Sequence, residues 1–229
     1  MITVDSEGSF EMAIDGKRIT DAKRAIEKLI DELGEASKDR LYSYAAFIPN
    51  NDSFMQSLAL GLVDNWDDVE KTEAHSTIIR EYIVRAVADK LTEASLRKDY
   101  IVVRKELPKT AAYIKLADLG DGVERFLTAA LWIETIKPKV ILWDDLEAAL
   151  HPQMVDVILE WLANGEWQIV ASTHSIDVLE AFANADIKDG KVIQLWKSSD
   201  DVLDWKGLTV DELNELLESG MDARKIFRW

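Results

Sequence analysis

Hydrophobic residues in the second half of the chain alternate between short continuous runs and longer segments with helical spacing. Three short apolar runs are bounded by polar residues, as buried strands are: 140–143 (VILW), 167–173 (WQIVAST) and 191–197 (KVIQLWK). Three other segments place their apolar residues on one face of a helix: 152–163, 175–184 and 209–218. This alternation predicts an α/β fold with a mostly parallel sheet flanked by helices, because uninterrupted apolar strands are typical of sheets covered on both faces.

The first half of the chain is less regular. Residues 2–19 (ITVDSEGSFEMAIDGKRI) contain turn signals at Glu7-Gly8 and Asp15-Gly16, which predicts a β-hairpin. Apolar spacing predicts further elements: a helix over 21–34, a buried strand within 44–51, mostly helix over 53–97, strands over 100–106 and 111–119 joined around Pro108, and a helix to about Thr135. We expect one continuous domain, with the N-terminal β-hairpin and helical sub-domain over 1–110 and the α/β lobe over 111–229.

The composition of the chain bears on which partners it could bind. The chain has 43 acidic and 27 basic residues, a net charge of −16, and its densest basic stretches, 97–105 and 222–229, are short. Nucleic acid stays open as a partner of the full protein, but the sequence has no evident basic surface for it. The chain has no cysteine, no apolar run of about 18 residues and no signal-peptide pattern. We therefore expect no thiolate metal site, no membrane partner and a cytoplasmic location.

Polar side chains follow two of the expected strands. Asp144 and Asp145 come directly after 140–143, and the segment 172–175 (STHS) ends the next strand. The carboxyl ends of parallel strands share one edge of a sheet, and ligands of open α/β sheets bind there. Mg²⁺ is typically held by one or two carboxylates next to substrate phosphates, so this edge is a reasonable magnesium site.

Two glycines stand where the strand at 111–119 gives way to a helix. Gly120 and Gly122 flank Asp121. Glycines at a helix N-terminus let backbone N–H groups approach a phosphate, and the helix dipole favours its negative charge. A tight turn without a ligand explains the same residues equally well.

Three segments, LGDGVERF (119–126), VILWDDLEAALHP (140–152) and ASTHS (171–175), resemble in this order the signature, Walker B with D-loop, and switch-histidine motifs of ABC-type ATPases. They are most similar to the SMC-like AAA group that includes the overcoming-lysogenization-defect nucleases and related ATP-binding proteins. The closing segment 207–224 is similar to the usual C-terminal end of that family, and the resemblance covers roughly residues 40–229. It implies a P-loop NTPase fold of the ABC-ATPase type.

The resemblance implies a role for each matching residue. Asp144 would hold Mg²⁺ through water, Asp145 stands where the family places its catalytic glutamate, and His174 would sense the γ-phosphate of ATP. Glu147 is a candidate substitute for the catalytic acid. The signature residues would cap the γ-phosphate of a nucleotide bound to the partner in a homodimer: Leu119, Gly120, Asp121 and Gly122. Positioning and electrostatics of this kind are most of what phosphoryl transfer requires.

Two features depart from the family pattern. Asp145 is one methylene shorter than glutamate, and misplacing a catalytic group by about 1 Å can cost about a hundredfold in rate. The Walker A pattern G-x-x-x-x-G-K-[ST] does not occur, since the Gly-Lys pairs at 16–17 and 190–191 lack its other residues. We therefore expect an ABC-ATPase-like fold that lacks its N-terminal P-loop lobe, in a truncated chain or one half of a split protein. The Walker A lobe would come from a missing N-terminal segment or from a separate chain.

Two other functions fit the same residues. A catalytically inactive interaction module that keeps the ATPase fold is favoured by the absent Walker A pattern and by Asp145. A metal-dependent nuclease or phosphohydrolase would use the aspartates directly on a metal. A metal site built from His151, His174 and Asp144 lacks the close spacing of standard zinc motifs.

Overall fold

The computed structural model describes residues 2–4, 10–14, 17–19, 44–185, 187, 189–197 and 200–225, with the backbone alone described up to residue 19. The chain divides into two compact units, Met1–Ala45 and Ala46–Trp229. In the first unit, three strands pair antiparallel in sequence order: β1 (Ile2–Val4), β2 (Phe10–Ile14) and β3 (Lys17–Ile19). The antiparallel pairing expected for 2–19 is thus confirmed, whereas its turns and the helix expected over 21–34 lie outside the described residues.

Three strands of the second unit form the sheet that carries the polar strand ends. They are β4 (Ala45–Ile48), β8 (Val140–Trp143) and β9 (Gln168–Ala171), in the order β4-β8-β9. β8 pairs with β9 in parallel, with Trp143 opposite Ala171, so the residues that follow both strands meet at one edge. The expected α/β fold with a parallel sheet flanked by helices is confirmed.

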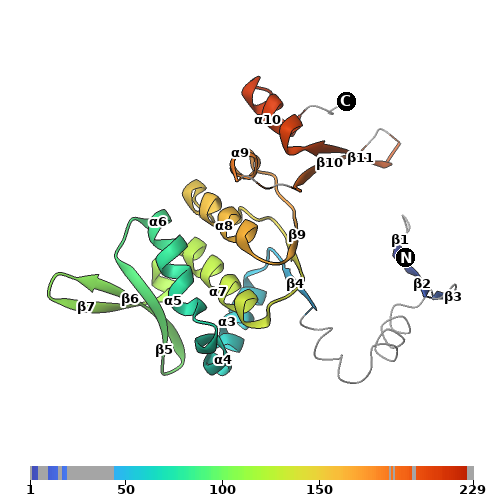
Figure 1. Ribbon diagram of the computed structural model, residues 1–229. Helices are drawn as coiled ribbons and strands as arrows, with labels where there is room; N and C mark the ends of the chain where they lie inside the picture. The colour runs from blue at the N-terminus through green and yellow to red at the C-terminus, as the bar shows by residue number, and fades with distance from the viewer. Residues whose placement is uncertain are drawn as a thin grey trace. The chain divides into compact units, whose positions relative to one another are not determined.

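Three helices occupy the segments predicted around these strands: α7 (Asp121–Ile136), α8 (Pro152–Asn164) and α9 (Ile176–Asn184). α8 begins at Pro152, and His151 Nδ1 caps it by accepting from the backbone N–H of Gln153 at 3.3 Å. α7 and α8 bury their apolar residues in one core with Ile141 and Trp143, and both lie on the same side of the sheet (Figure 1). No helix in the described part of the chain is long and apolar enough to cross a membrane.

Short helices follow β4: α3 (Asp52–Asp64), α4 (Trp66–Lys71), α5 (Ala74–Ile78), the π-helical turn η2 (Ile79–Ile83) and α6 (Val84–Val87). The helical prediction for this part of the chain is confirmed up to residue 87. It is wrong over 91–97, which form strand β5 (Leu91–Arg97). Leu91 and Ala94 are buried where β5 pairs with the next strand, so sheet packing overrides the helix preference of leucine, glutamate and alanine in this segment.

β5 belongs to a second three-stranded sheet with β6 (Tyr100–Leu107) and β7 (Thr110–Lys115), and all its pairs are antiparallel. Its inner face places Ala94 and Val103 in the core. The strand pair around Pro108 is confirmed, but β7 ends at Lys115. Residues 116–119, expected as strand, form a 3₁₀ turn (η3, Leu116–Leu119) that leads into α7.

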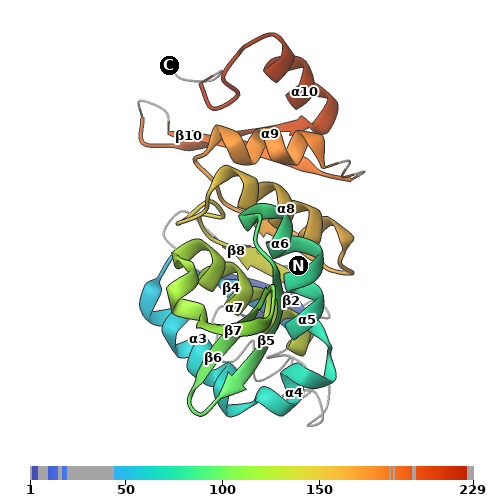
Figure 2. The same ribbon diagram turned by 90° about the vertical axis from the view of Figure 1, so that its left-hand side faces the viewer.

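The last elements differ most from the sequence pattern. β10 (Lys191–Lys197) is a strand as predicted, but it pairs antiparallel with β11 (Leu203–Thr209) in a separate sheet and not with the parallel sheet. The pattern does not indicate β11 because Asp204, Lys206 and Gly207 are poor strand formers. α10 (Val210–Glu218) starts at a capping box and packs against α9, as Figure 2 shows.

The outer face of the parallel sheet is open. Phe47, Leu142 and Val170 are 51%, 39% and 57% exposed, whereas Ile141 and Trp143, their neighbours on the inner face, are 0% and 2% exposed. Within the described residues the sheet is therefore covered on one face, where the sequence pattern predicts cover on both.

Candidate functional site

The two polar clusters at the strand ends lie together in the structure. The backbone N–H of Asp144 donates to Ile48 O at 2.9 Å, and the backbone N–H of Ser172 donates to Trp143 O at 2.9 Å. Leu146 N donates in return to Ser172 O at 3.1 Å. These backbone bonds hold the segment after β8 between the ends of β4 and β9.

One hydroxyl joins the two aspartates. Ser172 Oγ donates to Asp144 Oδ1 at 2.7 Å and accepts from the backbone N–H of Asp145 at 2.8 Å. Asp144 is exposed and Asp145 is half-buried, so both can be reached from solvent. The adjacent carboxylates thus stand at the sheet edge and avoid the cost of burying two charges in the core.

Asp145 is also held from β4. Asn50 Nδ2 donates to Asp145 Oδ2 at 2.9 Å. The backbone of Asp145 is left-handed, with φ at +46°, and that of Ala149 is too, with φ at +62°. Such conformations cost about 1–3 kcal/mol each in residues other than glycine, and they cluster at functional sites. Sequence reasoning missed Asn50, whose only signal is the Pro-Asn-Asn stop at the end of the strand.

Glu147 and His174 are joined through the backbone. Glu147 Oε1 accepts from the N–H of His174 at 2.7 Å, while Oε2 is buried without a hydrogen-bond partner among the described residues. The carbonyl of His174 accepts from Arg224 Nη1 at 3.0 Å. Both sides of the histidine backbone are therefore fixed, while the residue itself is exposed.

The glycine segment packs against the turn that follows the aspartates. A Cβ at Gly122 would lie 2.6 Å from Ala149 O, so this close approach requires glycine. Gly120 is glycine for another reason, since its φ is +97° and a Cβ there would meet no atom within 4 Å. Leu119 is half-buried and Asp121 is exposed.

A buried arginine lies under the site. Arg125 is 7% exposed, its Nη2 donates to Pro49 O at 2.8 Å, and its Nη1 lies 3.9 Å from Asp52 Oδ1. Burial lowers the pKa of Arg125, and three nearby carboxylates oppose this effect: Asp52, Asp145 and Asp144. The guanidinium offsets part of the repulsion between the two adjacent aspartates. Sequence reasoning missed Arg125, which stands among apolar residues of α7 without any local signal.

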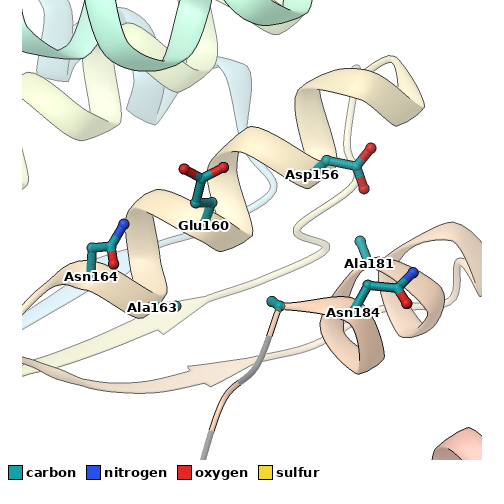
Figure 3. Close-up of a pocket in the computed structure, with 7 residues that line it drawn as sticks. Asp156, Glu160, Ala163, Asn164, Ala181 and Asn184 are labelled. Atoms are coloured by element: carbon teal, nitrogen blue, oxygen red, sulfur yellow. The ribbon is translucent and has the colours of Figure 1, made fainter.

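Other candidates take no part in this arrangement. His151 caps α8, and no group of three or more His, Cys, Asp or Glu side chains that could hold a metal ion occurs among the residues that the structure describes. A hollow of about 470 Å³ lies between α8 and α9, with Asp156, Glu160 and Asn184 in its lining (Figure 3). It shares no lining residue with the strand-end site.

Comparison with known proteins relates the chain to a family and to solved folds. The family model described as "AAA domain, putative AbiEii toxin, Type IV TA system" matches residues 15–180. An SMC head solved in complex with the C-winged helix domain of ScpA is similar at 17% identity over 93% of this chain and 68% of its own, with a TM-score of 0.57. At this identity, the likeness shows the fold alone.

Two further solved structures have lower scores. One comes from work on ATP-driven dimerization and DNA-stimulated activation of SMC ATPases, at 19% identity over 66% of this chain and 92% of that chain, with a TM-score of 0.46. The other is the Smc head domain of Pyrococcus furiosus with an extended coiled coil, at 17% identity over 86% and 47% of the two chains, with a TM-score of 0.44. No curated protein matches the chain.

Proposed function

Because the chain belongs to the AAA domain family whose model matches residues 15–180, we propose that it is the signature and magnesium-site part of an SMC-like ATPase that hydrolyses ATP at a dimer interface. The observation that carries this proposal is the contact between Ser172, which follows β9, and both aspartates, which follow the parallel strand β8. The glycine segment packs against the turn that follows this pair. Three segments far apart in sequence thus meet at one edge, which suits a reaction that depends on positioning and electrostatics.

The donors at this edge fit Mg²⁺. In proteins Mg²⁺ keeps several waters and is held by one or two carboxylates next to substrate phosphates. Asp144 is exposed, and Ser172 Oγ orients one of its carboxylate oxygens at 2.7 Å. We assign Asp144 to the metal and Ser172 to the orientation of that carboxylate. Bound with ATP, the metal would neutralise charge on the phosphates.

Asp145 would position the attacking water. Asn50 holds one of its carboxylate oxygens at 2.9 Å, which leaves the other oxygen to accept a hydrogen bond from water. Since aspartate is one methylene shorter than glutamate, we expect slow hydrolysis. His174 would contact the γ-phosphate from the turn after β9, and Glu147 would position His174 through the 2.7 Å bond to its backbone N–H.

A Walker A lobe would complete this half-site. The chain has no G-x-x-x-x-G-K-[ST] pattern that could surround phosphates with backbone N–H groups. Phe47, Leu142 and Val170 are at least 39% exposed on the outer face of the sheet, and exposed apolar patches mark interaction sites. We infer that a lobe carrying Walker A packs there, as part of the same polypeptide or as a second chain.

The glycine segment would serve the nucleotide of a second protomer. The space beside Gly120 is open, because a Cβ there would meet no atom within 4 Å. It stands at the N-terminus of α7, a helix of 16 residues whose dipole and free N–H groups favour a phosphate. We assign 119–122 to the γ-phosphate of ATP bound to the partner in a homodimer.

The test is ATP hydrolysis by the chain combined with a Walker A lobe. We expect phosphate release that requires Mg²⁺ and falls at least about a hundredfold in Asp144→Ala. Asp156→Ala is the matched control, because it removes an exposed carboxylate of α8 outside the site and should leave the rate unchanged. Equal rates in the wild type and Asp144→Ala would contradict the proposal.

Two results would favour the other functions. Cleavage of nucleic acid by this chain with Mg²⁺ and without ATP would support a metal-dependent nuclease. Binding of the lobe without any ATP hydrolysis would support an inactive interaction module.

A further inference from the structure

A short segment after α10 reaches back to the turn that carries His174. Its middle residue, Ala223, is 3% exposed and lies in a small apolar cluster with Leu179, Ala183 and Leu213. Leu179 and Ala183 belong to α9, the helix that begins directly after this turn. The buried Ala223 therefore ties residues 222–224 to α9, directly after the turn that carries His174.

Asp222 fixes the direction of the Arg224 side chain. Its two carboxylate oxygens accept from Nε and Nη2 of Arg224, each at 2.8 Å, and Oδ1 also accepts from the backbone N–H of Arg224 at 3.0 Å. The hydrogen bond from Arg224 is the main reason that the pKa of Asp222 lies below its ordinary value. A two-point bond between guanidinium and carboxylate sets orientation as well as energy. Nη1 is left to point away from Asp222.

Arg224 uses Nη1 to hold His174. It donates to the carbonyl of His174 at 3.0 Å, while the N–H of His174 donates to Glu147 Oε1 at 2.7 Å. Gln194 Nε2 donates in turn to Arg224 O at 3.2 Å, so β10 supports the same segment. Bonds to both flanking peptide units restrict φ and ψ of His174, and these angles set the direction of its Cα–Cβ bond.

We propose that Arg224 is a positioning residue for His174: held by Asp222, it fixes the backbone of the turn after β9 and thereby the direction of the imidazole at the strand-end site. The role of the imidazole at that site rests on the proposed function. The positioning of His174 by Arg224 does not, so it can be tested on the chain alone.

The first test uses the imidazole signals of the chain in a ¹H–¹³C spectrum. The chain has three histidines, so His174→Gln assigns the signal of His174. Arg224→Ala should shift that signal and leave those of His75 and His151 unchanged. Arg224→Lys keeps the charge and loses the planar fork, so it should shift the signal less, in the same direction. Lys109→Ala, which removes an exposed cation in the turn between β6 and β7, is the control and should leave all three signals in place.

Amide exchange measures the same hold. Losing a hydrogen bond from a charged group raises local opening by about tenfold or more, so a peptide over 172–177 should exchange about tenfold faster in Arg224→Ala. An unshifted His174 signal with unchanged exchange would overturn the proposal, and so would an equal effect of Lys109→Ala. If Arg224→Ala does not fold, Arg224→Lys and Asp222→Asn carry the test, and an unshifted signal in both would overturn it.

The completed ATPase gives an independent readout. Arg224→Ala should lower kcat by about tenfold to a hundredfold with little change in KM for ATP, and Arg224→Lys should recover part of the loss. An unchanged kcat would overturn the positioning role. If the wild type hydrolyses no ATP, the proposed function fails, while the histidine signals and amide exchange still decide whether Arg224 holds His174.

Discussion

The two three-stranded sheets of the second unit differ in how completely they are covered. In β5-β6-β7 the inner face lies in the core, and Val102, on the outer face, is only 2% exposed. Lys115 stands opposite Val102 on the neighbouring strand and lies 4.7 Å from the ring centre of Tyr100, while Arg97 lies 3.4 Å from that of Tyr113. Stacked cations and aromatic rings therefore cover part of the outer face with residues of the sheet itself, although Tyr100 and Tyr113 are still 40% and 43% exposed.

The parallel sheet β4-β8-β9 has an equally buried inner face, but in the part of the chain that the structure describes its outer face is exposed. Phe47 and Val170 are 51% and 57% exposed there, and on β10-β11 the opposed residues Leu195 and Trp205 are 60% and 66% exposed. Large apolar side chains in water favour association with another surface. Under the proposed function, one lobe that carries Walker A would supply both the cover of this face and the phosphate loop.

The largest expected difference in stability is between alanine substitutions at two adjacent residues of β8. Ile141→Ala, at a fully buried position, should lower the free energy of unfolding by about 2–5 kcal/mol. Leu142→Ala, at a position 39% exposed on the outer face, should cost about 1 kcal/mol or less. Urea unfolding of the chain alone measures both. Equal losses would mean that the outer face is already packed, and with the Walker A lobe bound the cost of Leu142→Ala should rise.

Periodicity predicted most of the parallel sheet and its helices, because continuous apolar runs such as 140–143 and the amphipathic spacing of 152–163 are local signals. The meeting of Asp144 with Ser172 was also predictable, since parallel strands end at one edge. Strand β5 was not predictable, because its Leu, Glu and Ala residues favour a helix, and only pairing with β6 makes the segment a strand.

The residues that support the site were not predictable from local patterns. Asn50 reaches Asp145 across 95 residues of sequence, Arg125 reaches Pro49 across 76, and Arg224 reaches His174 across 50. Each is a single polar side chain whose partner is set by the packing of elements distant in sequence. The open outer face was hidden as well, because a continuous apolar strand looks the same whether one face or both are covered.

Alanine substitutions at Gly120 and Gly122 should have different effects on the turn that follows Asp145. Gly122→Ala places a Cβ 2.6 Å from the backbone oxygen of Ala149, so it should cost about 1–3 kcal/mol and displace the turn after Asp145. Gly120→Ala meets no atom and strains only its own backbone, at about 1–3 kcal/mol. Amide exchange over 144–150 should therefore rise in Gly122→Ala and stay unchanged in Gly120→Ala. Unchanged exchange in both variants would show that the turn does not depend on this contact.

The cation–ring pairs on the outer face of β5-β6-β7 should contribute less to the free energy of unfolding than one buried core residue does. Arg97→Ala removes the cation over Tyr113 and exposes the outer face of the sheet, so it should cost about 0.5–1 kcal/mol. Lys109→Ala, which removes an exposed cation in the turn between β6 and β7, is the control and should change stability by less than about 0.5 kcal/mol. If the two variants unfold at the same urea concentration, the stacked layer does not complete this sheet, and the contrast with β4-β8-β9 weakens.

The smallest effect concerns Glu124, in the first turn of α7, where the candidate site joins the shared core. Burial raises the pKa of its carboxyl above the ordinary 4.5, and Asp121 raises it further. Between 4.5 and the raised value the folded chain binds more protons than the unfolded one, so this contribution to stability falls as the pH rises through that window.

Glu124→Gln removes the penalised charge and should raise the free energy of unfolding at pH 7 only slightly, because partial exposure screens the charge. It should also flatten the pH dependence just above 4.5. Asp121→Asn removes only the second cause and should flatten it less. Because the effect depends on burial at the start of α7, binding of the Walker A lobe to the outer face of the sheet should leave it unchanged. A pH dependence that changes when the lobe binds would mean that the lobe also covers the start of α7. The lobe would then contact more of the chain than the outer face of the parallel sheet.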